Sequence, residues 1–166
     1  MEKIIRLALK MGVTTLELGH LCNRNYAADE PYWLFYSPEG KKIYANTQEG
    51  YTFLAQFLPA WVSFLKKNGW YDLSVQHVGD EPGPSKMNEY RILCGIVRKF
   101  MPGVKLFDAV MHTELEGSVD YWVLQNWHYQ NQREIYEHYR SLGDEIWQYT
   151  GHVHPRRSRR RVLCGM

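Results

Sequence analysis

The sequence lacks any apolar run that approaches the ~20 residues needed to cross a bilayer. Its first fifteen residues, MEKIIRLALKMGVTT, lack the continuous apolar core and small-residue cleavage site of a secretory signal, and they predict an amphipathic helix instead. Three cysteines, Cys22, Cys94 and Cys164, are an odd number at unrelated spacings, which fits neither a disulfide framework nor a zinc site. A membrane-spanning protein and a small disulfide-rich protein are therefore not predicted.

A strong excess of charge is also missing, because the formal net charge is only +2. Even this excess comes from one segment, RRSRR at residues 156–160 followed by Arg161, so the rest of the chain is mildly acidic. No global basic field attracts nucleic acid, and the aromatic residues are not interleaved with the arginines. Binding of nucleic acid through the arginine-rich segment is therefore only weakly supported by the sequence.

Apolar periodicity predicts one domain in which five strands are separated by helices. The predicted strands span residues 13–20, 73–78, 104–111, 119–126 and 145–150, and the predicted helices span 2–11, 49–68, 86–100 and 131–142. Residues 32–46 predict a β-hairpin around a Pro-Glu-Gly turn. This alternation indicates an α/β fold whose parallel strands are joined by right-handed crossovers.

Two architectures fit this alternation, an open doubly wound sheet and a (β/α)8 TIM barrel. No glycine-rich phosphate loop follows any predicted strand, which disfavours a nucleotide-binding sheet. Polar residues instead end several strands, where barrel enzymes collect their catalytic groups. Since a whole barrel takes about 250 residues, we expect residues 1–151 to form a partial (β/α)8 barrel of about five parallel strands. Its unpaired edges are candidate contacts in a homo-oligomer.

The composition changes abruptly in residues 152–166, HVHPRRSRRRVLCGM, which show no helical or strand period. This segment is predicted to be a basic tail that is either disordered or out of the natural reading frame. His152 and His154 alone do not predict a metal site, because no third ligand follows at a defined spacing. Because the expected barrel is incomplete, we also expect the native N-terminus to lie upstream of this chain.

Two adjacent acids, Asp80 and Glu81, follow the predicted strand 73–78 within the segment GDEPG. A retaining glycosidase usually holds two carboxyl groups about 5 Å apart across the glycosidic bond, which neighbouring residues do not easily straddle. Neighbouring acids suit a reaction in which the 2-acetamido group of the sugar attacks its own anomeric carbon. One acid then orients the acetamido group while the other protonates the leaving oxygen. GDEPG is equally compatible with a solvated turn, since Asp, Pro and Gly are common in turns.

Three segments resemble the catalytic domain of glycoside hydrolase family 123, the β-N-acetylgalactosaminidases: HVGDEP at 77–82, MNEYRILCGIVRKFMPGVKLFDAV at 87–110 and VDYWVLQN at 119–126. Residues 50–70, GYTFLAQFLPAWVSFLKKNGW, are similar to the family's helix before the acidic strand. The resemblance implies a (β/α)8 barrel and substrate-assisted, retaining hydrolysis of β-linked N-acetylhexosaminides, with GalNAc favoured over GlcNAc. It also implies that Asp80 assists the acetamido group, that Glu81 is the general acid/base, and that no metal or other cofactor takes part.

Further candidate substrate-binding residues lie in or near the ends of the other predicted strands: Glu17, His20, Asp108, Asn126, Trp127 and Tyr149. Trp127 would stack on a sugar ring, and Asn126 or Tyr149 would bind sugar hydroxyls. His20 and Asp108 are also compatible with purely structural hydrogen bonding. Carbohydrate is therefore the predicted partner, either as the substrate of an enzyme or as the ligand of a non-catalytic relative with the same cleft.

Overall fold

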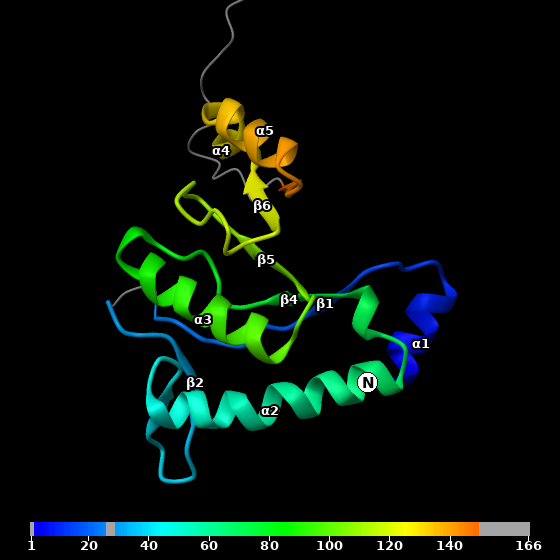
Figure 1. Cartoon of the computed structure of the whole chain (residues 1–166), viewed down its shortest axis with the longest axis vertical. Coiled ribbons are helices and arrows are strands. Elements are labelled where there is room, and N and C mark those ends of the chain that lie inside the picture. The colour runs from blue at the N-terminus through cyan, green and yellow to red at the C-terminus, as the bar shows by residue number, and fades with distance from the viewer. Residues whose placement is uncertain (1, 26–28, 150–166) are drawn as a thin grey trace, which may run out of the picture.

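A five-stranded parallel sheet forms the centre of the protein (Figure 1). The computed structural model describes residues 2–25 and 29–149, so the predicted tail at 152–166, with His152 and His154, lies outside the described residues. The strands are β1 (Leu16–Leu18), β4 (Ser74–His77), β5 (Lys105–Ala109), β6 (Tyr121–Gln125) and β7 (Glu145–Tyr149). They lie side by side in this order, and each neighbouring pair is parallel. The predicted α/β fold is confirmed as a partial barrel whose sheet does not close, since β1 and β7 remain its edges.

The helices and the hairpin follow the predicted order with one difference, at residue 126. The helices are α1 (Glu2–Lys10), α2 (Gln48–Lys67), α3 (Met87–Phe100), α4 (Asn126–Asn131) and α5 (Arg133–Ser141), and the antiparallel hairpin pairs β2 (Trp33–Tyr36) with β3 (Lys42–Tyr44). Asn126, predicted to end a strand, instead begins α4. Residues 110–120, all of them described, connect β5 to β6 without a helix, and none of the predicted helices falls there.

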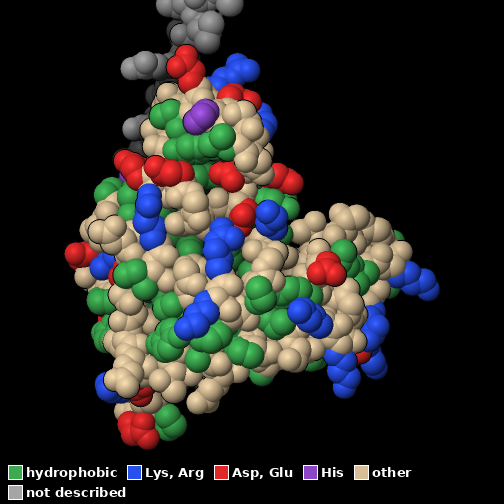
Figure 2. Space-filling view, viewed as in Figure 1, with side chains coloured by type: hydrophobic (Ala, Val, Ile, Leu, Met, Phe, Trp, Pro, Cys, Tyr) green, Lys and Arg blue, Asp and Glu red, His purple; other side chains and the backbone are tan. Residues whose placement is uncertain are grey.

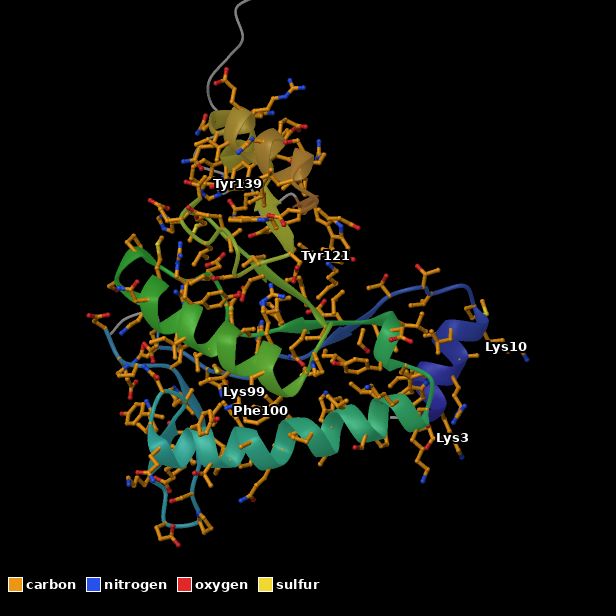
Figure 3. The ribbon with its side chains drawn as sticks, in the orientation of Figure 1. Lys3, Lys10, Lys99, Phe100, Tyr121 and Tyr139 are labelled. Carbon is orange, nitrogen blue, oxygen red and sulfur yellow. The ribbon has the colours of Figure 1, made fainter. Side chains whose placement is uncertain are left out.

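The two faces of the sheet differ in what packs against them. Leu106, Trp122 and Leu124 are fully buried and pack in the core with residues of α3 and α5. Tyr139 of α5, labelled in Figure 3, stacks on the Trp122 ring at 4.9 Å between centroids. Because side chains alternate across a strand, neighbouring residues such as Phe107 and Tyr121 lie on the opposite face. On that second face Phe107 is buried, whereas Tyr121 of β6 is only partly buried and Trp147 of β7 is exposed.

Helices α2 and α3 lie beside each other below the sheet in Figure 1. Lys99 Nζ donates to Tyr51 Oη at 2.8 Å, and the Phe100 ring lies 5.7 Å from the Tyr51 ring; Lys99 and Phe100 are labelled in Figure 3. In the view of Figure 2, hydrophobic side chains remain exposed in patches over this region, between Lys and Arg side chains. Within the described part of the chain, no helix combines the length and apolarity that a membrane span requires.

Four aromatic side chains form a row of stacked rings along α2, and three of them are exposed. Consecutive ring centroids of Phe53, Phe57, Trp61 and Phe64 lie 5.6, 6.3 and 5.3 Å apart. Three of these rings also line a cavity of about 440 Å³ between α2, β2 and the end of β1. The row of rings leaves an apolar helix side only partly covered by the described residues.

Candidate active site

The acidic pair lies in a bend directly after β4. Asp80 and Glu81 are both half-buried, and Pro82 after them is buried. In an extended strand two successive side chains would point to opposite faces, but residues 79–81 form a bend and are free of this constraint. The bend therefore allows both carboxylates to be directed toward one side of the loop.

Gly79 brings the backbone of this bend against a buried ring. A Cβ atom at this position would lie 2.9 Å from Cε1 of Tyr32, closer than real Cβ contacts. The Tyr32 ring is fully buried, and its backbone N–H donates to Glu89 Oε1 of α3 at 2.8 Å. The missing side chain at Gly79 thus lets the main chain that carries the two acids rest directly on the core.

Glu81 has a left-handed backbone, with a φ of 43°. This region is uncommon for a residue other than glycine, and it raises the energy of the folded state by roughly 1 kcal/mol or more. The Glu81 carboxylate faces Arg24, whose Nη2 lies 4.0 Å from Oε2, and both side chains are mostly buried. A strained backbone held beside a mostly buried cation is typical of a functional position.

A hydrogen-bonded carboxylate lies under the same bend. Asp108 of β5 is fully buried; its Oδ2 accepts from the Tyr90 hydroxyl at 2.7 Å and from the Gly79 N–H at 3.2 Å. Its Oδ1 lies 2.8 Å from Nε2 of His77. Since a carboxylate only accepts, His77 donates this hydrogen bond from Nε2. Asp108 thereby links β4, β5 and α3 immediately before Asp80.

This network changes the acid–base properties of His77. Burial by itself lowers the pKa of His77, but the hydrogen bond to Asp108 and the negative charges of Asp108, Glu17 and Asp80 outweigh it. The pKa of His77 is therefore raised above the ordinary value of a histidine. The predicted substrate contact at Asp108 remains a prediction; its location assigns it a positioning role under the bend.

Two further predicted residues, Glu17 and His20, lie near the acidic pair. The His20 ring stands edge-on to the His77 ring at 3.8 Å between centroids. Glu17 Oε1 lies 3.7 Å from Nδ1 of His77. Ligand atoms of His20, His77 and Asp80 all lie within 4.8 Å of one another. The structure thus brings Glu17, His20 and Asp80 together around the buried His77 ring.

A second group of predicted residues lies at the ends of β6 and β7. Gln125, the last residue of β6, accepts from Trp127 Nε1 at 2.5 Å and donates to the Tyr149 hydroxyl at 3.3 Å. Trp127 is more than half exposed at the start of α4. Asn126, also in the first turn of α4, is half-buried. Gln125 therefore connects two of the predicted sugar contacts.

Aromatic rings on the face of the sheet opposite Trp122 lie between these groups. The Phe107 ring lies 4.6 Å from the His77 ring and 6.5 Å from the ring of Trp147 in β7. Trp147 also lies 5.2 Å from Tyr121. Because parallel strands end at the same edge, this face leads from the acidic pair toward the ends of β6 and β7.

Sequence patterns alone miss three residues of this site. Arg24 stands in an irregular stretch between β1 and the hairpin, where no periodicity marks it. The patterns mark Gln125 only as an ordinary strand residue, and Tyr32 only as part of the hairpin. The pairing of β1 with β4, and the course of the chain after β1, bring Arg24 to Glu81.

The arrangement is suited to acid–base chemistry on a ligand that enters beside residues 20–24. His20 lies near Asp80 and Arg24 lies near Glu81, and both belong to the segment that follows β1. Backbone hydrogen bonds from Leu21 N–H to His77 O and from Cys22 N–H to Val78 O hold this segment along β4. The two carboxylates therefore face one common segment of the chain.

Comparisons with known proteins bear on the family and the fold of the chain. The family model described as "Glycoside hydrolase 123, catalytic domain" matches residues 1–158. A similar solved structure is that of a family 123 glycoside hydrolase from Clostridium perfringens. That structure was described in connection with the hydrolysis of glycolipid glycans. It is 14% identical with a TM-score of 0.63, and the match covers 90% of this chain but only 28% of that protein, so this likeness supports the fold alone. No curated protein matches the chain significantly.

Proposed function

Because the chain belongs to glycoside hydrolase family 123, we propose that it carries the catalytic acids of an enzyme that hydrolyses β-linked N-acetylhexosaminides. N-acetylgalactosamine is the favoured sugar. The observation that carries the proposal is the adjacent, half-buried pair Asp80 and Glu81 in the bend after β4, facing residues 20–24. The substrate of the Clostridium perfringens relative, a glycolipid glycan, also supports a carbohydrate substrate.

The two acids have separate roles in the proposed reaction. Glu81 gives its proton to the glycosidic oxygen while the acetamido oxygen of the sugar attacks the anomeric carbon and the bond to the leaving group breaks. Asp80 accepts a hydrogen bond from the acetamido N–H and stabilises the positive oxazolinium ring that forms. Glu81 then removes a proton from water, which opens the ring and restores the original configuration.

The surroundings of the pair support these roles. Arg24, 4.0 Å from Glu81, orients the general acid, and Asp108 fixes the backbone N–H of Gly79 just before Asp80. A positioned acid/base contributes about 10²–10⁴-fold in rate. Trp127 and Tyr149, joined through Gln125, supply a ring and a hydroxyl for neighbouring sugar units.

The first test is to replace Glu81 with Gln, which keeps the shape of the side chain and removes its proton. The assay uses this chain and the longest open reading frame that contains it, with an aryl N-acetyl-β-galactosaminide as substrate. We expect kcat to fall about 10²–10⁴-fold, with a larger loss for a poor leaving group than for a nitrophenolate. Glu49→Gln, an exposed acid of the first turn of α2, is the matched control. Undiminished turnover by the Glu81→Gln variant refutes the assignment.

The second test separates substrate assistance from a two-sided mechanism. Replacing the N-acetyl group by N-trifluoroacetyl makes its oxygen a weaker nucleophile, so the rate should fall steeply with fluorination, and Asp80→Asn should flatten this dependence. A rate that is indifferent to fluorination contradicts the proposed nucleophile. If the protein binds N-acetylgalactosamine in a titration but releases no product, the alternative of a non-catalytic carbohydrate-binding relative holds instead.

A further inference from the structure

Two histidines and Asp80 of the acidic pair form a cluster with metal-binding chemistry. A ring nitrogen of His20, a ring nitrogen of His77 and a carboxylate oxygen of Asp80 all lie within 4.8 Å of one another. We propose that this cluster binds a divalent zinc ion. The prediction that no metal takes part concerned the reaction itself, whereas this ion is a separate ligand of the site.

His77 is the fixed member of the cluster. The residue is only 6% exposed, and its buried Nδ1 atom has no hydrogen-bond partner. Its other nitrogen, Nε2, lies 2.8 Å from the buried carboxylate of Asp108. Histidines that bind zinc characteristically donate their second ring N–H to a carboxylate, which fixes the tautomer and directs the other lone pair at the metal. The contact with Asp108 leaves Nδ1 of His77 as the ligand atom.

His20 and Asp80 are the adjustable members. His20 is exposed and Asp80 is half-buried, so an ion can reach the cluster from solvent. Bonds of about 2.0–2.2 Å to zinc bring tetrahedral ligand atoms to roughly 3.5 Å from one another. The present spacing needs only side-chain rotations at the surface to reach this geometry, while the buried His77 ring stays in place.

The ligand types select the metal. Two imidazole nitrogens and a carboxylate oxygen suit zinc and its neighbours among the transition metals, while magnesium and calcium prefer oxygen ligands only. Glu17 Oε1, 3.7 Å from Nδ1 of His77, is available as a fourth ligand. The cluster therefore accepts zinc and discriminates against the hard cations.

Zinc in this position has a consequence for the reaction that rests on the proposed function. Coordination would occupy the carboxylate of Asp80 and prevent it from accepting the acetamido N–H. Zinc is then expected to inhibit hydrolysis in competition with substrate. Zinc binding itself does not depend on hydrolysis, so the two proposals are tested by different measurements.

The experiment measures zinc binding by calorimetric titration of the whole chain. The starting protein carries His152→Ala, His154→Ala and Cys164→Ser, because these side chains of the C-terminal segment are alternative zinc ligands. We expect binding of one ion per chain, unaffected by excess magnesium. Cobalt, which replaces zinc in such sites, should give the intense visible absorption of tetrahedral nitrogen and oxygen coordination.

Variants locate the ion. His20→Ala and Asp80→Asn, both at accessible side chains, should each weaken zinc binding at least tenfold, and Asp108→Asn should weaken it by about 10–100-fold through His77. The control is His138→Ala, an exposed histidine of α5, which should leave the affinity unchanged. Circular dichroism melts confirm that each variant is folded. Equal zinc affinity in the starting protein and in folded His20→Ala overturns the proposal, as does loss of binding in His138→Ala.

The outcomes also separate this proposal from the proposed function. Zinc binding by a protein that cleaves no glycoside leaves the metal site standing and removes the enzymatic assignment. Hydrolysis by a protein that binds no zinc supports the enzymatic assignment and removes the metal site.

Discussion

The strands β4 and β7 both carry candidate site residues at their C-terminal ends, but they differ in burial and in their position in the sheet. All four residues of β4 are buried, whereas none of the five residues of β7, all of which the structure describes, is buried. β4 lies inside the sheet between β1 and β5, while β7 is an edge. The difference indicates that the acids are positioned by the core, whereas the aromatic residues of β7 offer an accessible and more adaptable surface for a ligand.

The largest effect is expected for Asp108→Ala in β5, because the Asp108 carboxylate holds His77 at the end of β4. This substitution leaves the N–H and O–H donors of His77, Tyr90 and Gly79 buried without their acceptor. The free energy of unfolding should fall by about 3–5 kcal/mol, as measured by urea denaturation. Gln148→Ala, an exposed change in β7, should stay within about 0.5 kcal/mol. Similar losses of stability in both variants would contradict the contrast between the buried network that holds β4 and the exposed strand β7.

A smaller effect is expected from Gly79→Ala in the bend after β4. The new methyl group would meet the Tyr32 ring at 2.9 Å, and either the ring or the bend must shift. We expect a loss of about 1–3 kcal/mol in the free energy of unfolding, together with reduced activity because the backbone of Asp80 moves.

Gly83→Ala is the matched control for this change. Gly83 has a φ of −82°, and its added Cβ would meet nothing within 4 Å. Alanine there should be neutral or should stabilise by about 0.4–1 kcal/mol through the unfolded chain. Thermal melts of the two variants compare them directly. If Gly79→Ala melts like Gly83→Ala, the close contact with Tyr32 does not limit the bend.

The smallest effect is expected away from β4 and β7, at Glu30, which precedes the hairpin and pairs with Lys42 of β3. Hydrogen bonds from Lys42 and from the Tyr44 hydroxyl lower the pKa of Glu30 below its usual value. A carboxylate whose pKa is lowered by folding adds stability above its unfolded pKa, and this stability is lost as the pH falls through the folded pKa. The stability advantage of the wild type over Glu30→Gln should therefore shrink between about pH 7 and pH 3. Denaturation curves at both pH values measure it.

Lys42→Met removes the other half of this pair and provides the check. Its stability relative to the wild type should show the same dependence on pH, because Lys42 lies 2.6 Å from Glu30. A difference between wild type and variant that is constant with pH would mean that the contact contributes nothing to stability.

The strands of the sheet were predictable because each is marked by its own residues and by the turn residues that follow it. The run LSVQHV marks β4 by its β-prone composition, and the following Gly-Asp-Glu-Pro marks its end, so the location of Asp80 and Glu81 after a parallel strand could be predicted. The order of the strands followed from the alternation with helices. Only the lengths differed, since residues 13–20 predict a strand and β1 spans Leu16–Leu18.

The partners of the acids were not predictable in the same way. His20 and His77 are far apart in the sequence, and their contact depends on the parallel pairing of Leu16–Leu18 with Ser74–Gln76. The helical conformation of Asn126 and Trp127 was missed because the strand pattern of VDYWVLQN runs into α4 without a Gly or Pro signal. Periodicity reports which face a residue takes but not which distant residue it meets.

The left-handed backbone of Glu81 places folding and chemistry in opposition at a single residue. Glycine would adopt a φ of 43° without steric penalty, so a search for greater thermal stability would favour removing the carboxylate on which the proposed reaction depends. A protein engineered only for stability would tend to lose its proposed general acid at this position. At the bend after β4, greater stability and the proposed activity therefore call for different residues.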